Sequence, residues 1–309
     1  MEATRAATSG YQGLRESAAW IDLSARGKIR ALGEDRVRLL HAMTTQDVQS
    51  LTPGQGGYAF FLNAQGRILG DVNIFCFEDS LLLDTEPETR RKLFEHIDRY
   101  IIADDVTLED VTEQMVTIAV QGPEAAAVLK RLGAPAPEVE YSTASWGNRT
   151  VARVNGFYVF LPFTEKVELV AALDTAGVAS ATLDDLRTVR IERGRPRYGE
   201  EITERYLVQE TGQLHGVHFA KGCYLGQEIV ERVRSRAQIH RVLRRVEIDL
   251  LEPPPAGTKL KSGDADAGEI ASAVFSSALG KTVAMAYVRT QFAEPGTEIA
   301  LGEARARVL

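Results

Sequence analysis

The stretch from Phe219 to Arg236, FAKGCYLGQEIVERVRSR, holds one of the two cysteines of the 309-residue chain. Cys223 follows Lys221 by two residues, and the residues after it have the apolar spacing of a helix that begins near Leu225. A helix N-terminus and a nearby ammonium both favour the thiolate, which is the nucleophilic and metal-binding form of cysteine. The stretch therefore predicts a reactive thiol at Cys223 assisted by Lys221. The alternative is that Cys223 is a small buried side chain without chemistry.

A second candidate is a glutamate that lies among the arginines of an arginine-rich stretch. Glu192 lies in LRTVRIERGRPRYGEEI, which carries five arginines. A carboxylate accepts two parallel N–H bonds from a flat, amidine-like edge, and the 2-amino and N3–H edge of a pterin is such a donor pair. Glu192 is accordingly a candidate for holding a pterin, with the arginines near an anionic tail. An ion pair that only stabilises the structure is the alternative.

The chain is acidic overall but basic next to the thiol. Its formal net charge is −7, whereas residues 219–245 contain seven basic and two acidic side chains. Arg232 belongs to this basic segment. Such a segment suits an anionic ligand or an RNA strand, and the overall charge argues against a protein that coats nucleic acid over its whole surface.

The elements that must position these residues indicate an α+β protein. Residues 58–63, 67–77 and 81–85 predict strands, and residues 87–101 and 165–177 predict helices. A further helix is expected over residues 185–194 with Asp184 as its N-cap, and residues 1–20 are expected to be a loose lead-in. After about residue 240, short strand-like runs separated by Pro and Gly predict a small β-barrel. We therefore expect a region of residues 1–240 followed by a domain of residues 241–309.

Composition indicates the compartment. The two cysteines are Cys76 and Cys223, and there is no C-x-x-C pair, which excludes a disulfide scaffold and favours a reducing cytosol. The N-terminal residues lack the apolar core of a signal peptide, and no apolar run approaches the roughly 18 residues of a membrane span. The prediction is a soluble cytoplasmic protein without a membrane partner.

The segment KGCYLGQE, residues 221–228, resembles the signature of the YgfZ family of folate-binding proteins, which are relatives of the aminomethyltransferase (T-protein) of the glycine cleavage system. Residues 22–69, 120–125, 190–202 and 279–299 resemble the corresponding parts of these proteins. The resemblance implies two interwoven α+β lobes and a C-terminal β-barrel around a channel that binds tetrahydrofolate.

The resemblance also implies roles for single residues. Glu192 matches the glutamate that grips the pterin, and Tyr58 and Asn63 lie on the segment that lines the folate site. T-proteins carry paired acids where this chain has Gly70 and Asp71, so aminomethyl transfer would depend on Asp71 alone.

Three functions follow as hypotheses. The first is a folate-binding accessory protein that supports assembly or repair of iron–sulfur clusters, and thereby tRNA modification by cluster-dependent enzymes, with Cys223 as its reactive group. The second is a folate-dependent aminomethyltransferase or a related one-carbon transferase. The third is a non-catalytic binder of RNA or a protein through residues 219–245.

Overall fold

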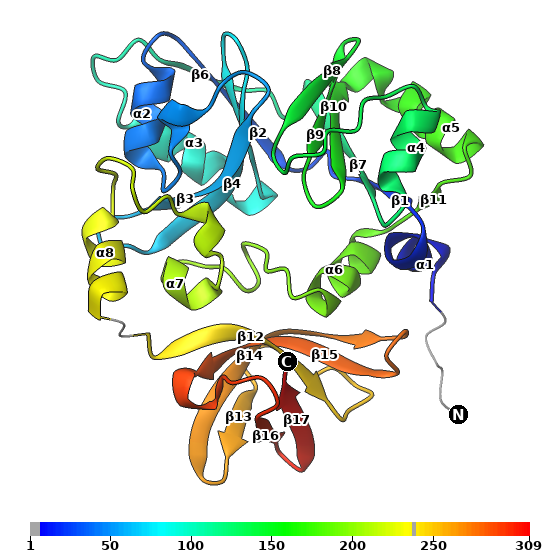
Figure 1. Cartoon of the computed structure of the whole chain (residues 1–309), viewed down its shortest axis with the longest axis vertical. Coiled ribbons are helices and arrows are strands. Elements are labelled where there is room, and N and C mark those ends of the chain that lie inside the picture. Colours follow the sequence, from blue (N-terminus) through cyan, green and yellow to red (C-terminus); the bar gives the residue numbers. More distant parts are fainter. Residues whose placement is uncertain (1–6, 237–238) are drawn as a thin grey trace.

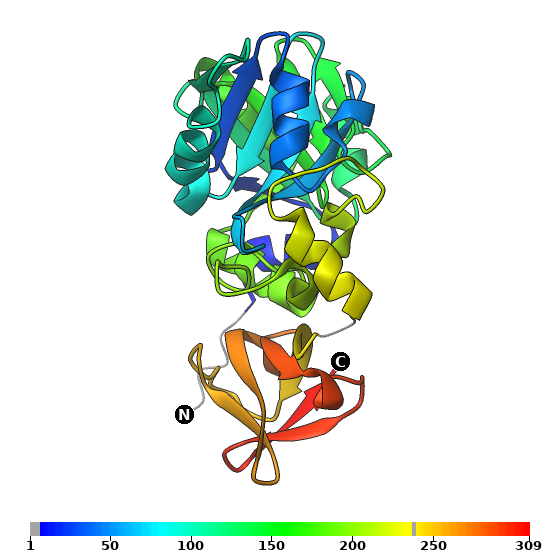
Figure 2. The same cartoon turned by 90° about the vertical axis from the view of Figure 1, so that its left-hand side faces the viewer.

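The computed structural model describes residues 7–236 and 239–309. Figure 1 shows two α/β lobes side by side above a separate barrel, and Figure 2 shows the same blocks from the side, with a layer of helices between lobes and barrel. The functional residues expected from the sequence are distributed over the lobes and this helical layer.

The first lobe is a five-stranded sheet covered by two helices. Its strand order is β3-β4-β5-β2-β6, with bounds Gly56–Leu62, Ile68–Cys76, Leu81–Thr85, Gly27–Leu32 and Thr107–Asp110. Helices α2 (Arg36–Met43) and α3 (Arg90–Asp98) contribute Leu40, Leu93 and Ile97 to its apolar core. Because one face of this sheet packs on helices, the side chains of the other face are free to form a site.

The second lobe is a six-stranded sheet. Its order is β11-β1-β7-β10-β9-β8, with bounds Ala179–Ser180, Ala19–Asp22, Met115–Gln121, Phe157–Pro162, Arg149–Arg153 and Thr143–Trp146. Helices α4 (Ala125–Arg131) and α5 (Lys166–Thr175) pack on it through Val128, Leu129, Leu169 and Leu173.

The two lobes are interwoven by the start of the chain. Helix α1 (Ser9–Glu16) and strand β1 precede the first lobe in sequence, yet β1 pairs with β7 and β11 of the second sheet. The expectation of a loose lead-in is therefore wrong from Ser9 onward; residues 1–6 lie outside the described part of the chain. Thr8 caps α1 by accepting a hydrogen bond from the Tyr11 amide, and Leu14 is fully buried.

Helices α6 (Leu183–Glu192), α7 (Val208–Thr211) and α8 (Gln227–Arg236) form the layer between lobes and barrel (Figure 1). The N-cap of α6 is Thr182 rather than the predicted Asp184. Thr182 and Asp185 exchange the two hydrogen bonds of a capping box, which satisfies two backbone donors at the helix start. Helix α6 therefore begins two residues earlier than predicted.

The C-terminal strands close into a barrel in the order β12-β15-β14-β13-β16-β17, with bounds Arg241–Ile248, Lys281–Arg289, Ala265–Ser276, Lys259–Ser262, Glu298–Leu301 and Ala304–Val308. Its interior contains the fully buried side chains of Val246, Leu260 and Val288. The predicted class, α+β with two interwoven lobes and a C-terminal β-barrel, is confirmed. Within the described residues, every helix is too short or too polar to cross a membrane.

Candidate functional site

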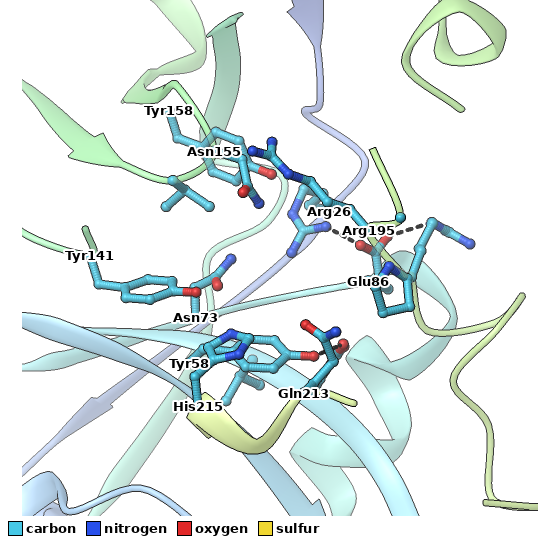
Figure 3. Close-up of a pocket in the computed structure, with 16 residues that line it drawn as sticks. Arg26, Tyr58, Asn73, Glu86, Tyr141, Asn155, Tyr158, Arg195, Gln213 and His215 are labelled. Atoms are coloured by element: carbon cyan, nitrogen blue, oxygen red, sulfur yellow. Dashed lines mark hydrogen bonds and ion pairs between the residues drawn. The ribbon is translucent and has the colours of Figure 1, made fainter. Parts of the chain in front are cut away.

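A polar cavity of about 310 Å³ lies where the two lobes meet the segments after α6 and α7 (Figure 3). This volume is at the lower end of the range for small-molecule sites. Aromatic, amide, carboxyl and guanidinium groups share the lining, which comprises Arg26, Tyr58, Asp71, Val72, Asn73, Glu86, Tyr141, Val154, Asn155, Tyr158, Gly194, Arg195, Pro196, Arg197, Gln213 and His215.

Tyr58 and Asp71, both predicted from the sequence, meet in this cavity. They lie on the neighbouring strands β3 and β4, and the Tyr58 hydroxyl donates to Asp71 Oδ2 over 2.6 Å. The His215 ring stacks on Tyr58, with 5.2 Å between ring centroids. Burial and then the nearby Glu86 raise the pKa of Asp71 to about 6. Asp71 can therefore take up or release a proton close to neutral pH.

The glycine beside Asp71 faces away from the cavity. Neighbouring residues of a strand point to opposite faces of the sheet. A Cβ atom on Gly70 would meet Leu93 of α3, with the nearest side-chain carbon at 3.0 Å. An acid at position 70 would point into the helix-covered core, so its absence does not remove a carboxylate from the cavity.

Two strained residues line the same cavity. Tyr141 and Asn155 are the non-glycine residues with positive φ in the described chain, at 63° and 48°. The backbone N–H of Tyr141 donates to the carbonyl of Arg153, and the backbone N–H of Asn155 donates to Glu140 Oε1. These two hydrogen bonds hold the backbone in its unfavourable conformation. Strained residues of this kind concentrate at ligand sites. Burial raises the pKa of Tyr141 to about 12, so its hydroxyl stays neutral.

An arginine organises the acidic side of the cavity. Arg26 donates to both carboxylate oxygens of Asp84, at 2.8–3.1 Å, and also pairs with Glu86. Asp84 is fully buried and accepts a further bond from Asn73 at 2.8 Å. These ion pairs raise the pKa of Arg26 against the opposing effect of burial. Arg26 thus fixes the wall that carries Glu86.

Glu192 is separated from Tyr58 and Asp71. It lines a different cavity, of about 320 Å³, next to Arg193 and Arg245. One carboxylate oxygen accepts from the Tyr11 hydroxyl at 2.5 Å, and the other pairs with Arg15. Both oxygens that would meet a pterin edge therefore already have protein donors, and the pterin role of Glu192 stays a prediction.

Two other predicted residues also lie away from the cavity. Asn63 Oδ1 accepts from the amides of Gln65 and Arg67 at 3.0 and 2.9 Å, which stabilises the β3–β4 turn. Arg232 is exposed on α8 and pairs with Glu228 at 2.5 Å. Neither side chain is part of the cavity wall. Their contacts support local structure, and their role toward folate stays untested.

Lys221 and Cys223 occupy different environments despite their spacing. The Lys221 ammonium is buried and donates to the carbonyls of His41, Thr44 and Gln46 at 2.5, 2.6 and 2.7 Å. An ammonium has three donors, and these bonds use all of them at the C-terminal end of α2. Burial lowers the pKa of Lys221 to about 8. The contacts of Lys221 are those of a helix cap rather than of a group that polarises a thiol.

Cys223 itself is exposed, which excludes the alternative of a buried small residue. Helix α8 begins at Gln227 rather than near Leu225 as predicted, so Cys223 lies four residues before the first residue of the helix. Cys76, by contrast, is buried in β4. Cys223 is therefore the cysteine that other molecules can reach.

A single loop joins the cavity to the thiol. At its start, Gln213 and His215 line the cavity. In its middle, the backbone N–H of His218 donates to the carbonyl of Thr45 at 2.8 Å. The chain then reaches the surface at Cys223. Within residues 7–236 and 239–309, no group of three or more His, Cys, Asp or Glu side chains is arranged to hold a metal ion.

The sequence prediction missed most of the cavity wall. Arg26, Asn73, Tyr158 and Gln213 come from segments far apart in the chain, and no local motif connects them. Asn155 could have been recognised from the sequence as a turn residue, because it precedes a glycine and the Asn-Gly pair tolerates positive φ. The architecture is thus a two-lobed protein with an appended barrel, and it holds a cavity of small-molecule size where the lobes meet.

The comparisons with known proteins assign the family. A model of the GCVT N-terminal domain matches residues 2–221, and a model of the glycine cleavage T-protein C-terminal barrel domain matches residues 241–308. The chain belongs to the glycine cleavage T-protein (GcvT) family. This membership is consistent with the predicted cofactor, tetrahydrofolate.

Individual relatives agree with this assignment. An aminomethyltransferase of Rubrobacter xylanophilus is 30% identical over 95% of this chain and 82% of its own length. One of Streptomyces coelicolor is 28% identical over 92% of this chain and 82% of its own length. The crystal structure of the glycine cleavage system aminomethyltransferase T from Bartonella henselae has a TM-score of 0.88 at 22% identity, covers 97% of this chain and 87% of its own, and shares the fold.

Proposed function

We propose that this chain is a tetrahydrofolate-binding accessory protein of the YgfZ type that supports assembly or repair of iron–sulfur clusters in the cytoplasm. In this role it sustains cluster-dependent enzymes, including those that modify tRNA. Cys223 is the group that acts on the cluster or its client, and the folate binds in the cavity between the lobes.

The fit of the cavity to folate supports the first half of this proposal. Tyr58, Tyr141 and His215 offer aromatic faces for a flat heterocycle. Gln213 and Asn155 direct side-chain amides at the cavity without other partners in the described chain, and Asp71 Oδ1 is not used by Tyr58. These groups match the donors and acceptors of a pterin edge.

The observation that carries the second half is the loop from Gln213 to Cys223. It places His215 on the floor of the cavity and the thiol at the surface, so one segment touches both the ligand and the solvent. The KGCYLGQE motif at residues 221–228 lies on this segment. An exposed cysteine sulfur is a suitable ligand for iron.

The test is rescue of an iron–sulfur enzyme in a strain that lacks this gene. Cys223→Ala is expected to restore at most a tenth of the activity that the wild-type chain restores, because the surface thiol is lost while the fold is kept. Cys76→Ala is the matched control, since it removes the buried cysteine and is expected to rescue. Full rescue by Cys223→Ala would remove the thiol from the mechanism.

The folate half has its own measurement, which also decides between two carboxylates. Asp71→Asn is expected to weaken tetrahydrofolate binding at least tenfold in calorimetry, because Asp71 lies in the cavity. Glu192→Gln is expected to change the dissociation constant less than threefold, because its oxygens are occupied by Tyr11 and Arg15. The reverse result would return the pterin to Glu192, as the sequence resemblance implies.

A one-carbon transferase is the second candidate, and the position of Asp71 favours it. The carboxyl lies in the cavity while Gly70 faces the core, so the chain retains a carboxylate where folate would bind. Its pKa of about 6 makes Asp71 a base above that pH and an acid below it. Turnover of an aminomethyl group on a lipoyl carrier, falling as the pH drops below about 6, would establish this activity. Folate binding without turnover would leave the accessory role.

A further inference from the structure

A smaller cavity lies at the junction of the helical layer and the barrel, and its volume is about 160 Å³. Arg205 and Tyr206, in the segment just before α7, form one side of it, and residues of strands β12, β13, β14 and β15 form the other. Figure 1 shows this junction, where the barrel strands lie next to α7. The cavity is smaller than a typical cofactor site, so it suits a small anion or a single functional group.

The wall of this cavity is basic. Its cationic side chains are those of Arg205, Arg241, Lys259 and Arg289, and its acidic side chains are those of Asp266 and Glu269. Hydrogen bonds from Arg205 and then from Lys259 lower the pKa of Glu269 to about 2, so this carboxylate stays charged and stays bound to its two cations.

Ion pairs do not balance the charge of the wall. Arg205 and Lys259 share the single carboxylate of Glu269, which leaves one positive charge over. Arg289 is exposed, and its guanidinium has neither a hydrogen bond nor an ion pair in the part of the chain that the structure describes.

The other charged groups neutralise one another. Arg241 pairs with Glu210, which lies outside the cavity, and Asp266 pairs with Lys261. The cavity and these partners together hold five cations and three carboxylates, an excess of two positive charges. Such an excess attracts an anion that carries two negative charges.

Two of the arginines are placed to act together. Arg241 and Arg289 are directly opposite each other on the antiparallel strands β12 and β15, so their side chains leave the sheet on the same face. Like charges in this position repel each other and destabilise the sheet. An anion bound by both guanidinium groups would remove that repulsion.

Arg241 is also held in place before any ligand binds. Its guanidinium lies over the rings of Tyr206 and Tyr287, at 4.8 and 5.6 Å from their centroids, and these buried rings stack on each other at 3.6 Å. Its Nε donates to Glu210 at 2.8 Å, and its two terminal nitrogens make no hydrogen bond within the described residues. Those nitrogens can therefore donate to a ligand without a large loss of side-chain entropy.

We propose that this cavity binds a phosphate dianion, either inorganic phosphate or the terminal phosphate of a small phosphomonoester, through Arg241 and Arg289. Guanidinium groups bind phosphate oxygens through paired, charge-assisted hydrogen bonds. The charge excess of two matches a dianion, whereas each phosphodiester of a nucleic-acid backbone carries one negative charge. The site is separate from the proposed folate site and does not depend on it.

The test is calorimetry on the full chain at pH 8 and constant ionic strength, with inorganic phosphate, methyl phosphate and dimethyl phosphate as probes. At this pH a phosphomonoester is a dianion, because its second pKa is about 6. Methyl phosphate is expected to bind at least tenfold more tightly than the singly charged dimethyl phosphate. Tighter binding of inorganic phosphate than of methyl phosphate would assign the site to the free ion, and the reverse order would assign it to a phosphomonoester.

Substitution of the unpaired arginine tests the location of the site. Arg289→Gln is expected to weaken methyl phosphate binding at least fivefold, and Arg289→Glu is expected to abolish it. Arg305→Gln is the matched control, because Arg305 is also an exposed barrel arginine without a side-chain hydrogen bond in the described residues, and it lies outside the cavity wall. It is expected to change the affinity less than twofold.

A second measurement uses the position of the cavity between two parts of the molecule. A ligand that contacts both the helical layer and the barrel binds only the folded chain, so methyl phosphate is expected to raise the melting temperature of the wild-type chain and not that of Arg289→Glu. Equal binding of methyl and dimethyl phosphate, equal losses in Arg289→Gln and Arg305→Gln, or no binding of either dianion would overturn the proposal. Binding of single-stranded RNA that is lost in Arg289→Gln, without binding of methyl phosphate, would overturn it in favour of a nucleic-acid backbone.

Discussion

Lys221→Met is expected to lower the free energy of unfolding by about 3 kcal/mol. The substitution keeps the approximate length of the side chain but removes the ammonium that donates hydrogen bonds to three carbonyl groups at the end of α2. Each buried acceptor left without a donor is costly, and a positive charge at a helix C-terminus is favourable. Urea unfolding at pH 7, followed by far-ultraviolet circular dichroism, measures the difference.

The matched substitution is Cys223→Ala, two residues away. Cys223 is exposed, so its replacement is expected to change the free energy of unfolding by less than about 0.5 kcal/mol. If Lys221→Met lowers the free energy of unfolding by less than about 1 kcal/mol, water replaces the ammonium as the donor to the three carbonyls. In that case the lysine would be free for a role beside the thiol.

Arg26→Met is expected to lower the free energy of unfolding by about 4 kcal/mol, because removal of one ion-pair partner leaves buried charges uncompensated. The Arg26 side chain is 12% exposed and that of Asp84 is 0% exposed, and the same guanidinium also serves Glu86. Its loss would leave the buried Asp84 and the cavity-lining Glu86 with fewer donors. The expected result is a lower urea midpoint together with weaker tetrahydrofolate binding.

Arg30→Met provides the control on the adjacent strand β2. Arg30 pairs with Glu109 at 3.3 Å, with side chains 35% and 45% exposed. Exposed pairs of this kind contribute little, so a change below about 1 kcal/mol is expected. Equal losses for Arg26→Met and Arg30→Met would contradict the idea that Arg26 fixes the cavity wall.

The sequence predicted the elements with strong periodicity. The strands expected over residues 58–63 and 67–77 correspond to β3 and β4, and the helix expected over residues 165–177 contains α5. Helix α1 escaped prediction because its sequence, SGYQGLRE, contains two glycines and few apolar residues. Its stability comes from the Thr8 cap and from the burial of Tyr11 and Leu14, which depend on distant parts of the chain.

The candidate site was predictable only in part, for a physical reason. The motif around Cys223 is contiguous, so its residue types could be read from the chain, but the destination of the Lys221 ammonium depends on three carbonyls about 180 residues away. Tyr58 and Asp71 meet because β3 and β4 form a hairpin, which is a local relation. Tyr141 and Asn155 reach the same cavity through the second lobe, and a relation between sheets leaves no trace in local spacing.

The placement of β1 has a consequence for synthesis on the ribosome. Ala19 pairs with Gln121 on one side and with Ala179 on the other, so the second sheet gains its first partner strands only when those residues have emerged. The strands of the first sheet, from Gly27 to Asp110, are complete earlier. A nascent chain that has emerged from the ribosome as far as about residue 115 would therefore present one finished sheet and an unpaired leading strand exposed to chaperones.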